Sequence, residues 1–151
     1  MLEILQKCEL FEGLSKDELR ELCLFAKPFN YEKDEVLFAQ GQEGDDIFIV
    51  HDGSIEMQLK LSLDEERKIA EFGPGQYFGE MSIFGGGIRT ASAISTTRSS
   101  GLILSGKMFD FIRLVKKPGY ASVLRKILIS ATLSLREMTK LLPTSQHLPS
   151  Q

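Results

Sequence analysis

The sequence has little of what metal centres, disulfide scaffolds and nucleic-acid-binding surfaces require. Only two cysteines and two histidines occur among its 151 residues, which excludes a disulfide scaffold and leaves too few ligands for a typical structural zinc site. The chain has 18 lysines and arginines against 21 aspartates and glutamates, for a net charge of −3. Because no basic surplus can neutralise a run of phosphates, sequence-independent nucleic-acid binding is disfavoured. We expect no metal ion and no resident cofactor.

Long apolar segments are also missing. No stretch reaches the ~20 consecutive apolar residues that span a bilayer, and residues 1–5 lack the basic head and apolar core of a signal peptide. We therefore expect a cytoplasmic protein with no membrane segment and with both thiols reduced. Hydrophobic residues make up 42% and charged residues 26% of the sequence, a balance typical of a single globular domain at this length.

The common motifs of catalytic sites do not occur. The sequence contains no His-Glu-x-x-His, no Cys-x-x-Cys, no Walker loop and no Gly-x-Ser-x-Gly. His51 follows an apolar run and precedes Asp52, which is typical of a surface or hairpin histidine, and His147 falls near the end of the chain. Hydrolysis or group transfer would then need paired carboxylates, and none stand out. We predict that the chain is not an enzyme.

A helix is predicted over residues 15–26. Ser15 and Glu18 have the Ser-x-x-Glu spacing of a capping box, in which each side chain satisfies a backbone donor of the other residue. Pro28 predicts the end of the helix, because proline disfavours a helical residue before it. The positions expected to face the core follow helical spacing: Leu19, Leu22, Cys23 and Ala26.

Between residues 29 and 104 the apolar pattern changes to that of β-strands. Residues 55–61 alternate apolar and polar side chains, and Asp52-Gly53 just before them predicts a tight hairpin with the preceding run. Turn-forming residues separate the apolar runs, which fall at residues 36–38, 47–50, 55–61, 69–72, 91–97 and 101–104. Many short strands at this spacing predict a sandwich, a jelly roll or a barrel.

Helical spacing returns after residue 104. We predict one helix at 107–115, a break at 117–119 and a longer helix at 120–142. One face of the longer helix carries an apolar stripe with coiled-coil-like steps: Leu124, Leu128, Ala131, Leu135, Met138 and Leu142. Two interpretations stay open: the stripe packs on the chain's own barrel, or it forms a homodimer interface through the C-terminal helix. The first is favoured.

Residues 79–92 interrupt the strand pattern in a way that suits a bound anion. Gly79 permits close approach of a ligand, and the short helix expected after it would present unpaired N–H groups. The three glycines at 85–87 let the chain fold back, so that Arg89 can bring its guanidinium to a phosphate. Glu80 could accept a hydrogen bond from a sugar hydroxyl. The alternative is an ordinary glycine-rich loop in which Glu80 and Arg89 form an ion pair.

The two segments 77–81 and 89–92, which read Tyr-Phe-Gly-Glu-Met and Arg-Thr-Ala-Ser, resemble the phosphate-binding cassette of the cyclic nucleotide-binding domain family. Residues 10–15 and 41–53 are similar to the family's N-terminal helical entry and early strands, and Phe109 is similar to its apolar hinge residue. The resemblance implies a mainly β fold with flanking α-helices, that is, a double-stranded β-helix or jelly-roll barrel.

The same resemblance implies a single cyclic nucleotide-binding domain over residues 1–142. Its parts would be the N-terminal helices at 1–27, the β-barrel at 28–105 with the cassette at 79–92, and the C-terminal helices at 106–142. The remaining residues, 143–151, are rich in proline, serine and glutamine and are expected to form a flexible tail.

The resemblance assigns a ligand-binding role to seven residues. Glu80 would bind the ribose 2′-hydroxyl, Gly79 would let the sugar approach, and Arg89 would pair with the cyclic phosphate. Met81 would lie beside the sugar. Backbone N–H groups for the phosphate would come from the remaining three: Ser82, Thr90 and Ala91. Met57 is expected to line the base. Thr90 resembles the threonine of many members that accept cyclic GMP, while cyclic AMP stays slightly favoured.

We therefore expect a cyclic nucleotide-binding sensor or regulatory module, which binds cyclic AMP or cyclic GMP and transmits binding through its C-terminal helix. The alternative is an interaction or dimerisation module of the same fold that has lost its response to the ligand. The sequence departs from the family pattern at two places. The glycines at 85–87 make that loop more flexible than is usual, and no helix-turn-helix follows the last helix, so direct nucleic-acid binding is not expected.

Overall fold

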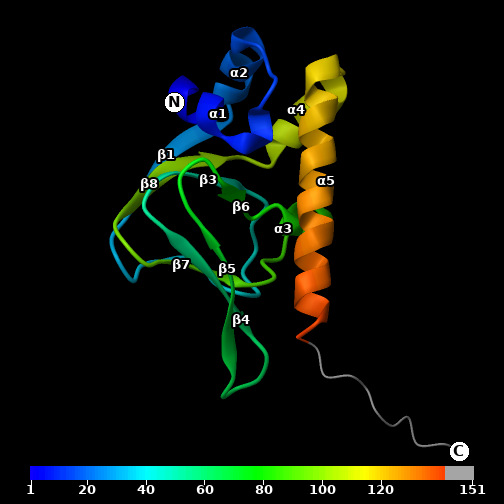
Figure 1. The fold of residues 1–151 in the computed structure, drawn as a ribbon. Helices are drawn as coiled ribbons and strands as arrows, with labels where there is room; N and C mark the ends of the chain where they lie inside the picture. The colour runs from blue at the N-terminus through cyan, green and yellow to red at the C-terminus, as the bar shows by residue number, and fades with distance from the viewer. Residues whose placement is uncertain (142–151) are drawn as a thin grey trace, which may run out of the picture.

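The structure, a computed structural model, describes residues 1–141, which fold into a β-barrel flanked by helices (Figure 1). In chain order the elements are α1 (Leu2–Lys7), the 3-10 turn η1 (Glu9–Phe11), α2 (Lys16–Cys23), β1 (Ala26–Tyr31), β2 (Val36–Phe38), β3 (Ile47–Asp52), β4 (Ile55–Lys60), β5 (Glu66–Phe72), β6 (Tyr77–Phe78), α3 (Met81–Phe84), β7 (Ser92–Ser95), β8 (Ser99–Leu104), α4 (Lys107–Val115) and α5 (Pro118–Thr139). The predicted mainly β, jelly-roll-like fold with flanking helices is confirmed. Residues 143–151, predicted as a tail, lie outside the described part.

Two antiparallel four-stranded sheets make up the barrel, with strand orders β1-β8-β3-β6 and β2-β7-β4-β5. The four apolar residues that begin strand β3 show how the sheets and helices share the core, because side chains alternate across a strand. Ile47 and Ile49 pack with the helices, whereas Phe48 and Val50 pack inside the barrel, and all four are at most 5% exposed. The continuous apolar run therefore reflects burial of both faces of this strand.

The turn at Asp52-Gly53 does not form the hairpin that the sequence predicted. It carries the chain from β3 in one sheet to β4 in the other, and β4 pairs with β5 and β7 instead. Gly53 has φ +90°, and a Cβ there would meet the backbone of Arg98 and Ser99. An Asp-Gly pair thus indicates a tight turn, but the partner of the next strand is decided by packing across the barrel.

The N-terminal helix α2 is shorter than predicted. Its capping box is present, with the Ser15 N–H donating to Glu18 Oε1 at 3.1 Å and the Glu18 N–H donating to Ser15 Oγ at 3.2 Å. The helix ends at Cys23, however, and Ala26 already pairs with Leu104 in β1. Pro28 did not mark the helix end, because it lies within β1, an edge strand where a missing N–H is tolerated.

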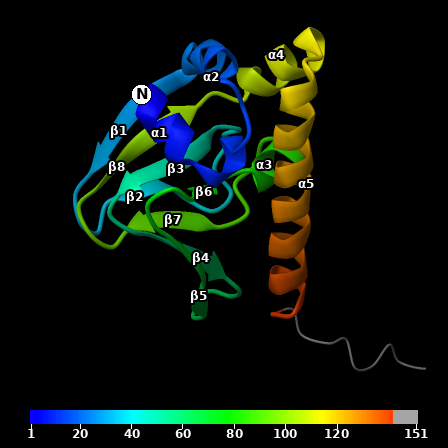
Figure 2. The same cartoon turned by 45° about the horizontal axis from the view of Figure 1, so that its top comes forward.

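The long helix α5 runs along one side of the barrel beside α3, as both views show (Figures 1 and 2). Its buried side chains are Tyr120, Val123 and Ile127. The predicted stripe was assigned largely to the wrong face: Met138 does line the cavity, but Leu128 is 57% and Leu135 is 58% exposed. Leu142 lies outside the described residues. No helix within residues 1–141 is both long and apolar enough to cross a membrane.

The apolar periodicity of the sequence did not identify the inward face of α5, for a physical reason. Beyond Ile127 its next inward positions are Ser130 and Ser134, which are polar and only partly buried. A search for apolar periodicity therefore selects the neighbouring leucines, which point outward. These two serines face the part of the barrel that carries the cassette, as the hydrogen bond of Ser130 to Glu80 and the place of Ser134 in the cavity wall show.

Candidate ligand-binding site

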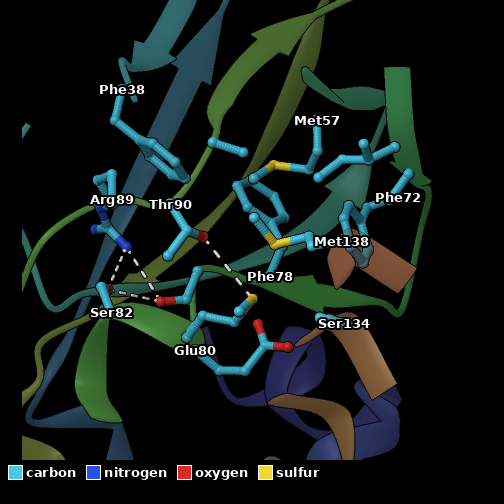
Figure 3. Close-up of a pocket in the computed structure, with 15 residues that line it drawn as sticks. Phe38, Met57, Phe72, Phe78, Glu80, Ser82, Arg89, Thr90, Ser134 and Met138 are labelled. Atoms are coloured by element: carbon cyan, nitrogen blue, oxygen red, sulfur yellow. Dashed lines mark hydrogen bonds between the residues drawn. The ribbon is translucent and has the colours of Figure 1, made fainter. Parts of the chain in front are cut away.

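The seven residues of the predicted site line one cavity. Gly79, Glu80, Met81 and Ser82 come from the β6–α3 junction, and Arg89, Thr90 and Ala91 come from the segment before β7. The cavity encloses roughly 460 Å³ of empty space, part of it open to solvent, and Met57 on β4 lines it as well. Figure 3 shows Arg89 and Ser82 at one end of this space and Met57, Phe72 and Met138 at the other. The cavity thus has a polar end and an apolar end.

Gly79 brings the two halves of the site together. Its φ of +94° belongs to the left-handed region that side chains disfavour. A Cβ at this position would stand 2.8 Å from the backbone oxygen of Asp46 and 3.0 Å from Arg89 Nη1. The glycine is therefore required both for the backbone turn and for the close approach of the arginine.

Arg89 is buried and is held in position by groups of the protein itself. It is 4% exposed, and its Nη1 donates to the backbone oxygens of Asp46 at 2.9 Å and Gly79 at 3.1 Å and to Ser82 Oγ at 3.0 Å. The guanidinium carbon lies 4.2 Å from the centre of the Phe38 ring, a cation–π distance. All of these contacts are to neutral groups.

The charge of Arg89 is thus not neutralised by a direct partner. The guanidinium forms no salt bridge with any carboxylate of residues 1–141, and burial lowers its pKa, an effect that the more distant charges of Asp46 and Asp45 oppose. A buried cation without a counter-ion is costly unless an anion completes its surroundings. The predicted alternative of a Glu80–Arg89 ion pair does not occur.

Among residues 1–141, Glu80 is a second buried charge without a counter-ion. Its side chain is 4% exposed, and Ser130 Oγ of α5 donates to its Oε1 at 2.7 Å. Burial raises the pKa of Glu80, while the hydrogen bonds from Ser130 and from its own backbone N–H lower it. The ionised carboxylate can accept further hydrogen bonds through Oε2, as a sugar hydroxyl would require.

Three backbone amides of the cavity wall have no acceptor within the described part of the chain. The N–H groups of Ser82, Thr90 and Ala91 take part in none of the hydrogen bonds within residues 1–141. Ser82 is 2% and Ala91 is 1% exposed, so water reaches the amides of these two residues poorly, and Thr90 between Arg89 and Ala91 is half-buried. Buried N–H groups are almost always paired in folded proteins. Three unpaired donors around one cavity, together with the Arg89 cation, make that end of the cavity suited to an anion.

The sequence analysis missed the contribution of residues 41–44, which hold the Arg89 segment in place. Gly41 N–H donates to the oxygen of Arg89, and the Arg89 N–H donates to the oxygen of Gln42, both at 2.8 Å. The Gly44 N–H donates to Gly87 at 2.7 Å, and a Cβ on Gly44 would lie 3.0 Å from Arg89 Nε. The sequence signals were the glycine content of this turn and its similarity to the family's early strands, and neither has a spacing relation to the cassette.

Helix α5 supplies further residues that the sequence analysis did not assign to the site. Ser134 and Met138 line the cavity together with side chains of the barrel. The apolar part of the wall comes from four strands and consists of Phe38, Met57, Ile69, Ala70, Phe72 and Phe78. An apolar end covered by a helix suits a flat heterocycle, which needs little hydrogen bonding. The fold and the cavity together define a barrel domain whose cavity, walled on one side by a C-terminal helix, is suited to a small anionic ligand.

Comparison with known proteins identifies the family. The sequence profile of the cyclic nucleotide-binding domain matches residues 28–114, and the chain therefore belongs to the cyclic nucleotide-binding domain family. It is 31% identical over 97 residues to a CRP-like cAMP-activated global transcriptional regulator of Mycobacterium tuberculosis, which covers 64% of this chain and 43% of that protein. It is 30% identical over 108 residues to the cyclic AMP receptor protein of Thermus thermophilus, which covers 72% of this chain and 49% of that protein.

Solved structures agree with this assignment. The catabolite activator protein of Thermus thermophilus superimposes with a TM-score of 0.73 at 28% identity, over 87% of this chain and 62% of that one. A cyclic nucleotide-binding domain from Methylobacillus flagellatus superimposes with a TM-score of 0.72 at 24% identity, over 99% and 84%. The second likeness supports the fold alone. The chain spans less than half the length of the two curated relatives described above.

Proposed function

We propose that this chain binds a cyclic nucleotide, cyclic AMP or cyclic GMP, in the cavity between the cassette and α5. The observation that carries the proposal is the set of three unpaired amides at Ser82, Thr90 and Ala91 beside the uncompensated charge of Arg89. One anionic group would satisfy all of them at once. We further propose a regulatory role in the cytoplasm, without catalysis, in keeping with the regulators among its relatives.

In this proposal each end of the cavity receives one part of the ligand. The cyclic phosphate lies against Arg89 and the free amides, and Glu80 accepts the ribose 2′-hydroxyl while Gly79 and Met81 lie beside the sugar. The base lies against Met57 and the apolar wall, under Met138. Thr90 Oγ1 donates to Met81 Sδ over 3.8 Å, a weak contact that a guanine amino group would displace. Cyclic AMP is the ligand we test first.

Ligand binding is proposed to change the pose of α5. The helix contributes Ser134 and Met138 to the cavity wall, so a ligand there makes contacts that depend on where α5 docks. A ligand shifts a conformational equilibrium by its differential affinity for the two states. Hydrogen exchange of α5 should therefore slow on addition of ligand, and unchanged protection over residues 118–139 would contradict the proposed response.

A second candidate function is an interaction or dimerisation module without a ligand response. The outward residues Leu128, Ile129, Leu133 and Leu135 of α5 favour it, because each is more than half exposed. This module would need neither the buried charges nor the free amides of the cavity. Sedimentation of the unliganded chain tests the self-association that this candidate requires.

Calorimetry separates the two candidates. We expect saturable binding of cyclic AMP or cyclic GMP by the unmodified chain. Arg89→Ala should weaken binding by about 2–5 kcal/mol, as the loss of one partner of a buried charge pair does. Arg98→Ala is the matched control, because Arg98 is exposed and pairs only with Glu32 on the surface. Equal affinities of the two variants, or no binding by the unmodified chain, would refute the proposal.

A further inference from the structure

We infer that Ser130 of α5 holds the Glu80 carboxylate in the orientation that accepts the ribose 2′-hydroxyl, and so sets the preference of the site for a ribose over a deoxyribose ligand. This inference rests on the proposed function and adds a positioning residue from outside the cassette. Ser130 acts through Glu80 and need not touch the ligand.

The first step is the isolation of the Glu80 carboxylate. It is 4% exposed and has no lysine or arginine partner within the described chain, and Ser130 is the one side chain that donates to it there. A hydrogen bond to an ionised group is stronger than one between neutral groups. Ser130 therefore supplies most of the directional stabilisation that this carboxylate receives from the protein.

The second step concerns which oxygen remains available. Ser130 Oγ occupies Oε1 at 2.7 Å, and this bond limits rotation about the terminal torsion of the Glu80 side chain. Oε2 is then presented to the ligand in one orientation. Figure 3 shows the Glu80 carboxylate pointing towards the helix that carries Ser134. Without the Ser130 hydroxyl, the carboxylate would lose the hydrogen bond that fixes its orientation and would take up a proton more readily.

The third step explains why Ser130 falls opposite Glu80. The start of α5 is anchored by Tyr120, whose hydroxyl donates to Glu21 Oε2 at 2.6 Å. One turn before Ser130, Lys126 Nζ donates to the backbone oxygen of Glu9 at 3.0 Å. These bonds to the N-terminal helices fix the position of α5 along its axis, and Ser130 lies on the same inward face as Val123 and Ile127.

The test compares cyclic AMP with its 2′-deoxy analogue by calorimetry. The unmodified chain should bind the 2′-deoxy analogue roughly tenfold more weakly or worse, because the analogue leaves Glu80 unpaired. Ser130→Ala should weaken cyclic AMP binding roughly five- to tenfold and leave binding of the 2′-deoxy analogue unchanged, so that the ratio between the two ligands shrinks. Ser122→Ala, a partly buried serine of the same helix remote from the cavity, is the matched control.

The outcomes separate the inference from the proposed function. If Ser130→Ala weakens both ligands equally, or neither of them, Ser130 does not act through Glu80 and the inference fails. If the unmodified chain binds both ligands equally well, the assignment of Glu80 fails instead. If it binds neither, the proposed function fails. A Glu80→Gln background gives a second measurement, since Ser130→Ala should there leave the ratio of the two affinities unchanged.

Discussion

Replacement of Gly79 by alanine tests whether the close approach at the cassette entry is needed. Two costs are expected. The first is the backbone strain of a non-glycine residue at φ +94°, about 1–2 kcal/mol. The second is steric, because the new Cβ would stand 2.8 Å from the Asp46 backbone oxygen and 3.0 Å from Arg89 Nη1. Overpacking of this kind adds about 1–3 kcal/mol.

Gly86→Ala is the matched control for the strain. Gly86 has φ +77° in the same loop region, and a Cβ there would meet nothing within 4 Å. It should therefore show the first cost of about 1–2 kcal/mol without the second. The difference between the two variants isolates the contact with Asp46 and Arg89.

Urea denaturation measures the free energy of unfolding, and calorimetry with cyclic AMP measures the affinity. We expect Gly79→Ala to lose about 2–5 kcal/mol of stability in total, and to bind more weakly than Gly86→Ala because Arg89 must move. If both variants lose the same stability and keep the same affinity, the close approach has no role and our reading of Gly79 is wrong.

Two further predictions concern charge and packing. Burial raises the pKa of Glu80 in the folded state. At a pH between the ordinary glutamate pKa and this raised pKa, the folded state therefore holds a proton that the unfolded state has released. The unfolding free energy of the unliganded chain should therefore fall as the pH rises from the ordinary glutamate range through this raised pKa, and Glu80→Gln should remove that part of the pH dependence. Ile127→Ala should cost about 2–5 kcal/mol in urea denaturation, since Ile127 is fully buried. Leu128→Ala, at a 57% exposed neighbour, should stay within about 0.5 kcal/mol, and a reversed order would overturn our assignment of the α5 faces.

Much of the site could be predicted because its residues are close in sequence. The seven cassette residues fall within thirteen positions, and local geometry brings Arg89 back to Gly79. The contributions of Gly44, Ser130 and Ser134 could not be predicted, since these residues lie far along the chain from the residues they serve: Gly44 lies against Arg89, Ser130 donates to Glu80, and Ser134 lines the cavity. No local pattern connects such residues to the cassette.

The fold was predictable to a similar extent. The strands at β2, β4 and β8 follow their apolar runs closely, whereas the two-residue β6 is too short to leave a pattern. The pairing of β4 was predicted wrongly, because a turn at Asp52-Gly53 says nothing about which sheet receives the next strand. The inward face of α5 was predicted wrongly for a related reason. The face that meets a polar cavity carries serines, and apolar periodicity favours the leucines beside them.

The flexible loop at 85–87 was expected to reduce affinity, because ordering three glycines on binding costs backbone entropy. Hydrogen bonds within the protein already supply much of that ordering. The Gly87 N–H donates to the oxygen of Ser82 at 2.8 Å, and the Gly87 oxygen accepts from Gly44. Arg89 is likewise held by three hydrogen bonds to groups of the protein itself. A preorganised site loses less entropy on binding, so the glycines need not weaken it, and the amides of Gly87 and Arg89, which donate to Ser82 and Gln42, should exchange hydrogen slowly even without ligand.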